Sequence, residues 1–131
     1  MVLHLKKNIL LFVVAFLPVL GFSQDVTIVN QFIRSMTDAQ KEQIVYEFSA
    51  DDRDDWHFLP WSSYERQGLS LKELRTEQKE LVHKLLRSSL SDTGYKQTTE
   101  IIGLENVLAA SSGDSVYRDP ERYYISIYGD P

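Results

Sequence analysis

The segment Thr76–Leu90, TEQKELVHKLLRSSL, decides the fold because it carries the clearest helical pattern in the chain. Its apolar residues recur at helical spacing and so form one face, with charged residues opposite. The apolar face comprises Leu81, Val82, Leu85, Leu86 and Leu90, and the charged face comprises Glu77, Lys79, Glu80, Lys84 and Arg87. Thr76 is the expected cap at the start of this helix. The sequence therefore predicts an amphipathic helix that packs one side on a core.

Two further helices are predicted before this segment. The first begins near Asp25, with apolar residues on one stripe at Ile28, Val29, Phe32, Ile33 and Met36. The second begins at Thr37, where Thr37 and Gln40 match a capping box. Its apolar stripe continues through Ile44, Val45 and Phe48, so we expect it to run to about Phe48.

Two other helical pieces flank the opening segment. Ser70 and Glu73 match a second capping box, which predicts a short helical turn. After a break at residues 91–94, the segment 95–110 carries helically spaced apolar residues at Ile101, Leu104, Val107 and Leu108. The sequence thus predicts four to five helices, each with an apolar face.

Two short strands are predicted, at residues 56–60 and 123–128, where aromatic and β-branched residues gather. Alternation along the second strand places Tyr123, Ile125 and Ile127 on one face and Tyr124, Ser126 and Tyr128 on the other. The fold class expected is α+β, in a mostly helical N-terminal portion. Because only residues 56–59 are available to pair with the second strand, we expect an incomplete domain whose missing C-terminal sheet covers residues 123–128.

The N-terminal 23 residues have the pattern of a signal peptide. Lys6 and Lys7 precede an apolar run from Ile9 to Leu20, and small residues follow at residues 21–23. The apolar run is too short to span a bilayer, so no stable membrane insertion is expected after cleavage. The chain has no cysteine, which excludes a lipoprotein anchor and disulfides. We expect residues 24–131 to be exported to the periplasm or the extracellular space.

The charge of the chain argues against nucleic acid as a partner. The formal net charge is −5, and removal of Lys6 and Lys7 with the signal peptide makes it more negative by two. No cluster of Lys and Arg with interleaved aromatic residues is present to bind a phosphate backbone.

Four stretches, in this order, resemble the domain of unknown function 3500 family along nearly all of residues 28–131. They are Arg53–Pro60, Gly68–Leu71, the helix end from Leu85 to Gly94 with Tyr95, and Arg118–Tyr124 continuing to Gly129. The resemblance implies an exported, uncharacterised protein and assigns no activity or cofactor. Members of the family look longer than this chain, with a Trp-Gly-Trp-Arg stretch and a His-His pair beyond the Tyr-Tyr strand. The resemblance therefore covers the N-terminal part of the family domain.

Two residues are candidates for catalysis, His57 and Arg53. His57 follows four acidic residues, and Asp54 or Asp55 would support it as a general base or a metal ligand. On this hypothesis the protein is a metal-assisted, hydrolase-like enzyme whose site needs the absent His-His pair. The alternative is that His57 is a polar spacer in a strand. The acidic run 51–55 does not match an EF-hand loop, so no metal site is assigned to it.

Arginine and tyrosine residues near the two predicted strands suggest a ligand-binding module. Arg66, Arg118 and Tyr124, with Arg122, Tyr123 and Tyr128, would form a pocket for a small anionic or sugar-like ligand. Arginine supplies forked donors and tyrosine supplies flat apolar faces. Ion pairing and sheet packing are the alternative roles for the same residues. The sequence does not decide between an enzyme, a ligand-binding module and a protein without either activity.

Overall fold

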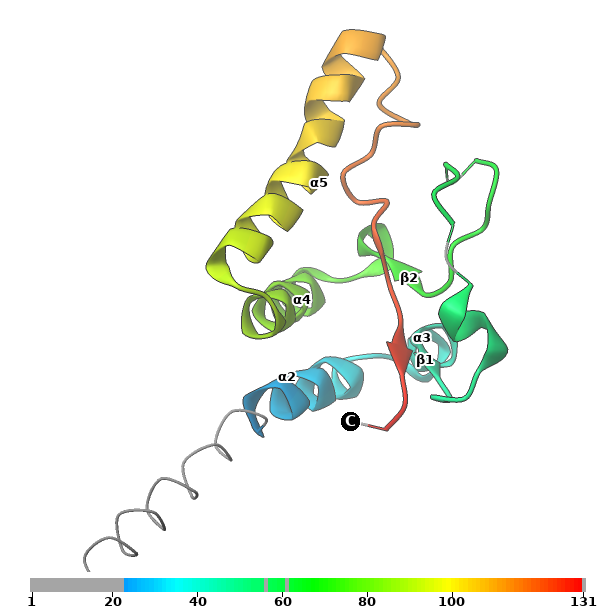
Figure 1. The fold of residues 1–131 in the computed structure, drawn as a ribbon, viewed down its shortest axis with the longest axis vertical. Helices are drawn as coiled ribbons and strands as arrows, with labels where there is room; N and C mark the ends of the chain where they lie inside the picture. Colours follow the sequence, from blue (N-terminus) through cyan, green and yellow to red (C-terminus); the bar gives the residue numbers. More distant parts are fainter. Residues whose placement is uncertain (1–22, 56, 61, 131) are drawn as a thin grey trace, which may run out of the picture.

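The computed structural model describes residues 23–55, 57–60 and 62–130, which form a mostly helical α+β fold (Figure 1). The helices are α2 (Ser23–Arg34), α3 (Asp38–Ile44), α4 (Thr76–Ser89) and α5 (Asp92–Ser112), with 3₁₀ turns η1 (Asp51–Asp54) and η2 (Leu71–Glu73). The strands are β1 (Val45–Tyr46), β2 (Leu69–Ser70), β3 (Tyr124–Ile125) and β4 (Ile127–Tyr128). The predicted signal peptide lies outside the described residues, except for Ser23, which begins α2.

The core lies where α2 packs against α4, and α3 and β2 contribute further buried side chains to it. Its buried apolar side chains are Phe32, Met36, Ile44, Leu69, Leu74 and Val82. The apolar faces predicted for the first, second and fourth helical segments therefore do meet. None of the helices among the described residues is both long and apolar enough to cross a membrane.

The fully buried side chain of Gln78 forms hydrogen bonds just after α2, in the first turn of α3 and at the start of α4. The side-chain amide of Gln78 donates to Ser35 O at 3.0 Å, just after α2, and to Gln40 Oε1 at 3.1 Å in α3. Its carbonyl Oε1 accepts from Arg75 N at 2.9 Å, which caps the start of α4. Arg75, and not Thr76 as predicted, is the residue at the N-cap position. The apolar face of α4 thus includes one polar residue that belongs to the core.

The predicted strand at 56–60 is wrong for the part that the structure describes, because residues 57–60 form no ladder. The carbonyl of His57 accepts from the Arg66 guanidinium at 2.9 Å, and the carbonyl of Leu59 accepts from it as well. These backbone groups are therefore satisfied by a side chain. Pro60 has no N–H to donate to a sheet.

The predicted strand at 123–128 forms as two short pieces, β3 and β4, separated by Ser126. β3 pairs with β2 in antiparallel orientation, with Leu69 opposite Ile125, and β4 pairs with β1 in parallel orientation. The expectation that only residues 56–59 could pair with this segment is wrong. The second predicted helix ends at Ile44 and not at Phe48, because Val45 and Tyr46 turn into the strand that receives β4.

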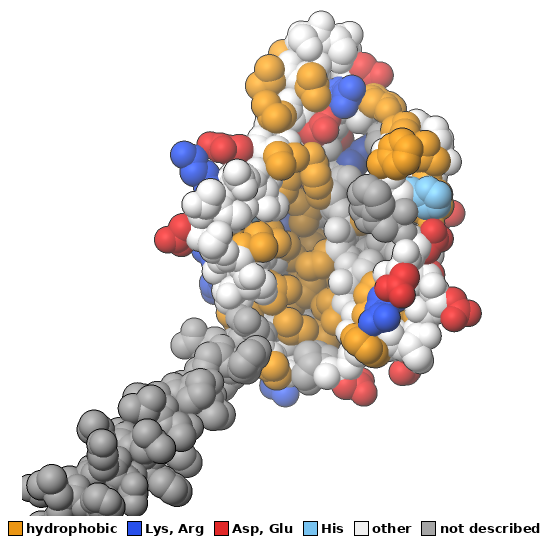
Figure 2. Space-filling model, in the orientation of Figure 1, with side chains coloured by type: hydrophobic (Ala, Val, Ile, Leu, Met, Phe, Trp, Pro, Cys, Tyr) orange, Lys and Arg blue, Asp and Glu red, His pale blue; other side chains and the backbone are white. Residues whose placement is uncertain are grey.

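α5 is longer than predicted, and its apolar face is not buried. The Ser91 hydroxyl accepts from Gly94 N at its start, and Gly113 ends it with a left-handed φ of 73°. Ile101, Leu104 and Val107 are 54%, 53% and 63% exposed. Figure 1 shows α5 extending away from the packed helices, and Figure 2 shows apolar side chains along it and down the middle of this face. The predicted apolar row of α5 is thus largely exposed in the part of the chain that the structure describes.

Candidate functional site

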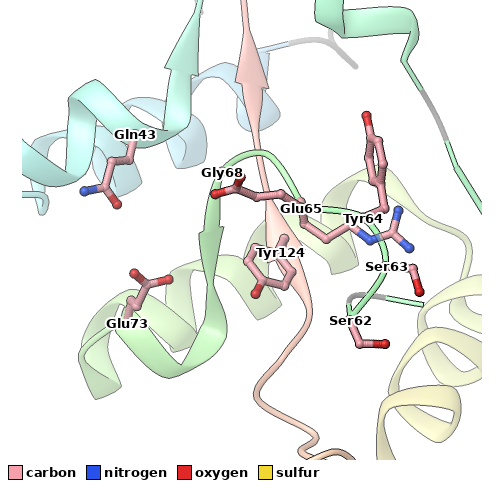
Figure 3. A pocket seen from close by; sticks show the side chains of 9 residues that line it. Gln43, Ser62, Ser63, Tyr64, Glu65, Gly68, Glu73 and Tyr124 are labelled. Carbon is pink, nitrogen blue, oxygen red and sulfur yellow. The ribbon is translucent and has the colours of Figure 1, made fainter. Parts of the chain in front are cut away.

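A cavity of about 620 Å³ opens beside β3, and most of the side chains around it are polar. α3 and η2 supply one side of it, and the loop that precedes β2 supplies the other (Figure 3). The lining residues are Gln43, Ser62, Ser63, Tyr64, Glu65, Arg66, Gly68, Glu73 and Tyr124. Two of the residues predicted to bind a ligand, Arg66 and Tyr124, are among them.

Tyr124 projects into this cavity because the strand alternates as predicted. Ile125 and Ile127 pack against the core, so Tyr124 faces the other way and is 40% exposed. Figure 3 shows its phenol ring lying between the Glu73 side and the Ser62 side of the cavity. A half-exposed aromatic ring offers an apolar face together with a hydroxyl group that can donate or accept a hydrogen bond.

Two carboxylates share the cavity with Tyr124. Glu73 accepts hydrogen bonds from Ser70 N at 2.9 Å and from Ser70 Oγ at 2.7 Å, which completes the capping box recognised in the sequence. Glu65 is an exposed loop residue, and Figure 3 shows it extending towards the side where Gln43 and Glu73 lie. The cavity therefore offers several hydrogen-bond acceptors around the Tyr124 ring.

Arg66 lines the cavity but directs its guanidinium to the neighbouring loop. Its Nη1 donates to His57 O at 2.9 Å, its Nη2 donates to Leu59 O, and its Cζ lies 5.6 Å from the centre of the Tyr64 ring. These contacts hold the 57–59 segment against the loop that forms the cavity wall. Arg66 thus shapes the cavity, and its charge is partly committed to two backbone carbonyls.

His57 belongs to a three-residue cluster at the edge of the same loop. Its Nε2 lies 3.4 Å from Asp55 Oδ1, and its ring lies 4.1 Å from the Tyr64 ring. The Tyr64 hydroxyl donates to Asp55 Oδ2 at 2.5 Å, and this hydrogen bond raises the pKa of Tyr64 above its usual value. Of the two acids expected to support His57, Asp55 is the one in contact.

Arg53, the other predicted catalytic residue, makes different contacts. Its guanidinium lies 4.3 Å over the Phe48 ring and 3.6 Å from Asp54 Oδ2. Among the described residues, no group of three or more His, Asp and Glu side chains is placed to hold a metal ion.

Arg118 lies in a second, smaller cavity of about 170 Å³. Its lining residues are Pro60, Glu105, Tyr117, Arg118, Asp119, Arg122 and Tyr123. The two cavities have no lining residue in common, because Tyr123 and Tyr124 point to opposite faces of the chain. The predicted group of Arg66, Arg118 and Tyr124 is therefore divided between two sites.

Several cavity residues were not predicted from the sequence. Gln43, Glu65, Ser62 and Ser63 are exposed polar residues, which in a sequence look like any solvated helix face or loop. Glu73 was recognised only as a capping residue. The Tyr-Tyr pair at 123–124 was the available sequence clue, since a strand with tyrosine on both faces must leave one of them outside the core.

Comparison with known families identifies the chain. The family model described as "Protein of unknown function (DUF3500)" matches residues 22–131, so the protein belongs to this family. No curated protein and no solved structure gave a match. Membership of this family assigns no function. A functional proposal therefore has to be argued from the geometry of the cavities.

Proposed function

We propose that this protein is exported and binds a small, uncharged, hydroxyl-rich ligand, such as a sugar, in the cavity beside Tyr124. The observation that carries the proposal is the half-exposed Tyr124 ring, set among hydrogen-bond acceptors in a cavity of about 620 Å³. Ligand sites commonly combine an apolar surface with a few polar groups that fix orientation.

The charges of the cavity favour an uncharged ligand over an anionic one. Glu65 and Glu73 bring two carboxylates. Among the described lining residues Arg66 is the one cation, and it is turned to the carbonyls of His57 and Leu59. An anion would be repelled by the carboxylates, because like charges close together are destabilising. Hydroxyl groups, in contrast, can donate to carboxylates while the ligand's apolar face lies on the Tyr124 ring.

The test is a titration of the protein with neutral monosaccharides and with the corresponding sugar acids, followed by NMR and calorimetry. We expect binding of at least one neutral sugar, and a loss of about two- to tenfold in affinity in Tyr124→Ala, because an aromatic contact contributes about 0.5–1.5 kcal/mol. Glu65→Gln should let the sugar acids bind better. Phe58→Ala is the control, since Phe58 is an exposed aromatic residue that is not on the cavity lining.

Two results would contradict this proposal. One is that no neutral sugar in the panel binds the folded protein. The other is that Tyr124→Ala and Phe58→Ala lower the affinity equally, which would mean that the Tyr124 ring makes no specific contact. Preferential binding of the sugar acids to the unaltered protein would reject the argument from charge.

Export is the second part of the proposal, and it rests on the charged, apolar and small-residue regions of residues 1–23. Cell fractionation followed by N-terminal sequencing tests it. A new N-terminus at Gln24 in the exported fraction is the expected result. Retention inside the cell with Met1 intact would contradict it.

We also infer that a further strand pairs with the segment formed by β3 and β4. Each of these strands belongs to a two-stranded sheet among the described residues, so each has one neighbour there. The aromatic and apolar side chains of the segment are half-buried or exposed. A strand edge of this kind is a template for another strand. We expect that strand to belong to the same domain.

A further inference from the structure

The apolar row of α5 is exposed even though α5 itself is fixed to the rest of the protein. The Tyr123 hydroxyl donates to Ile101 O at 3.4 Å, and Glu105 Oε2 lies 3.7 Å from Arg118 Nη1. These contacts hold the helix from the side opposite to the row. The exposed side chains of the row are Ile101, Leu104, Val107 and Leu108. The row is therefore a surface that α5 presents in a fixed position.

The two ends of the row differ in charge. Lys96 and Glu100 lie one turn apart at its N-terminal end, where Lys96 Nζ is 3.8 Å from Glu100 Oε1 and both side chains are largely exposed. The last turn of α5 has no basic residue. No side chain of that turn therefore offsets the partial negative charge of the carbonyl groups at the helix C-terminus. A cation at one end of this surface thus matches the helix dipole at its other end.

Gly103 gives a second, independent observation on the same surface. It lines a shallow hollow along α5 together with Leu104 and Val107. A glycine inside a helix costs about 1 kcal/mol relative to alanine. A Cβ at position 103 would meet nothing within 4 Å, so packing within the described chain gives no reason for glycine there. A second backbone that approaches this surface closely would give one.

We propose that the apolar row of α5 binds the same row of a second copy of this chain, with the two helices antiparallel. When Leu104 lies near the two-fold axis, Ile101 of each copy lies opposite Leu108 of the other. Lys96 then lies at the C-terminal end of the other helix, where a cation is stabilised. A parallel pair would instead place the two Glu100 side chains together, and like charges repel. The antiparallel pair therefore satisfies both the apolar pattern and the charges.

Single cysteine substitutions test the orientation, because the chain has no cysteine of its own. A disulfide needs two Cα atoms within about 7 Å. In the antiparallel pair the two copies of residue 101 are as far apart along the axis as residues 101 and 108 of one helix, which is about 10 Å. Under mild oxidation we therefore expect Leu104→Cys to form a linked dimer and Ile101→Cys alone to form little. A mixture of Ile101→Cys and Leu108→Cys should form the linked heterodimer.

Gly103→Gln tests the close approach of the two helices, by sedimentation velocity of the chain from residue 24. The added side chain is uncharged and bulky, so it should weaken dimerisation by about tenfold or more. The melting temperature of the dilute monomer should not fall, because glutamine is a better helix former than glycine. Asn106→Gln is the matched control, since Asn106 is exposed on α5 but does not line the hollow. It should leave dimerisation unchanged.

A chain that stays monomeric at every concentration would overturn the proposal. So would an Ile101→Cys variant that links to itself as readily as Leu104→Cys does, because the helices would then be parallel or in no fixed register. Equal dimerisation of Gly103→Gln and Asn106→Gln would show that the helices do not meet at this surface. If Gly103→Gln does not fold, the cysteine variants still decide, because they leave Gly103 in place.

Discussion

At the scale of single residues, Gly68 governs how closely the cavity loop approaches β3. Its φ of 91° lies in the left-handed region, and a Cβ at this position would lie 2.1 Å from Ile125 O and 2.5 Å from Ser126 Oγ. The next residue, Leu69, is the one that pairs with Ile125. The absence of a side chain at position 68 therefore lets β2 begin directly against β3.

We predict that Gly68→Ala destabilises the protein substantially. The left-handed backbone alone should cost about 1–2 kcal/mol, and the contact with a backbone carbonyl should add to that. Gly113→Ala is the matched control, because Gly113 has a φ of 73° but nothing within 4 Å of the added Cβ. Urea unfolding of both variants measures the difference. Equal losses of stability would show that the close approach at Gly68 contributes nothing.

At the scale of secondary-structure elements, the helices could be predicted and the strand pairs could not. A helix is specified locally, by apolar spacing over residues such as 76–90 and by caps such as Thr37 and Ser91. The pairs are two residues long and join positions far apart in sequence, as Val45 and Ile127 are. A pattern of two residues carries no period, so the partners of residues 123–128 were missed.

Some residues of the candidate site could likewise be predicted from the sequence, and others could not. The face of Tyr124 could be predicted from strand alternation. The contact between His57 and Asp55 is one of the two that their closeness in sequence predicted, the other being with Asp54. Gln43 and Glu73 reach the cavity only because α3 and η2 pack beside β2, which depends on the whole fold. The apolar row of α5 was predicted correctly as a row, but spacing alone does not tell whether a partner covers it.

One hydrogen bond between elements also makes the stability of the fold depend on pH. The hydrogen bond between Lys72 in η2 and Asp119 links the helical turn to the segment that leads into β3. Because the folded pKa of Asp119 lies below its usual 3.8, its ionised form stabilises the fold above that pH. The stabilisation disappears as the pH falls from about 3.8 through the lower folded pKa.

We therefore predict that Asp119→Asn lowers the free energy of unfolding at pH 6 and has progressively less effect as the pH falls below about 3.8, because Asp119 is then protonated first in the unfolded and later in the folded state. Denaturant unfolding across this range measures the difference from the unaltered protein. Asp54→Asn is the control, since Asp54 is exposed and only loosely paired with Arg53. A difference that stayed constant with pH would mean that the Asp119 charge does not stabilise the fold.

At the scale of the whole molecule, the described chain exposes two surfaces that are unfavourable in water. The first is the apolar row of α5 at Ile101, Leu104 and Val107. The second is the strand segment 124–128, in which β3 and β4 each pair with one strand among the described residues. Contiguous apolar surface and a strand edge both promote association. The small core around Phe32 and Val82 leaves little stability in reserve against such association.

We predict that the chain from residue 24 self-associates at micromolar concentrations, and that sedimentation velocity detects species larger than the monomer. Leu104→Lys should shift the distribution towards monomer, because it places a charge in the centre of the α5 row, and Tyr124→Lys should do the same for the strand edge. Val26→Lys changes an exposed apolar residue on α2 and serves as the control. A concentration-independent monomer that melts cooperatively would contradict the prediction. If Leu104→Lys acts and Tyr124→Lys does not, α5 is the surface that needs a partner, and the strand edge is sufficiently protected by β1 and β2.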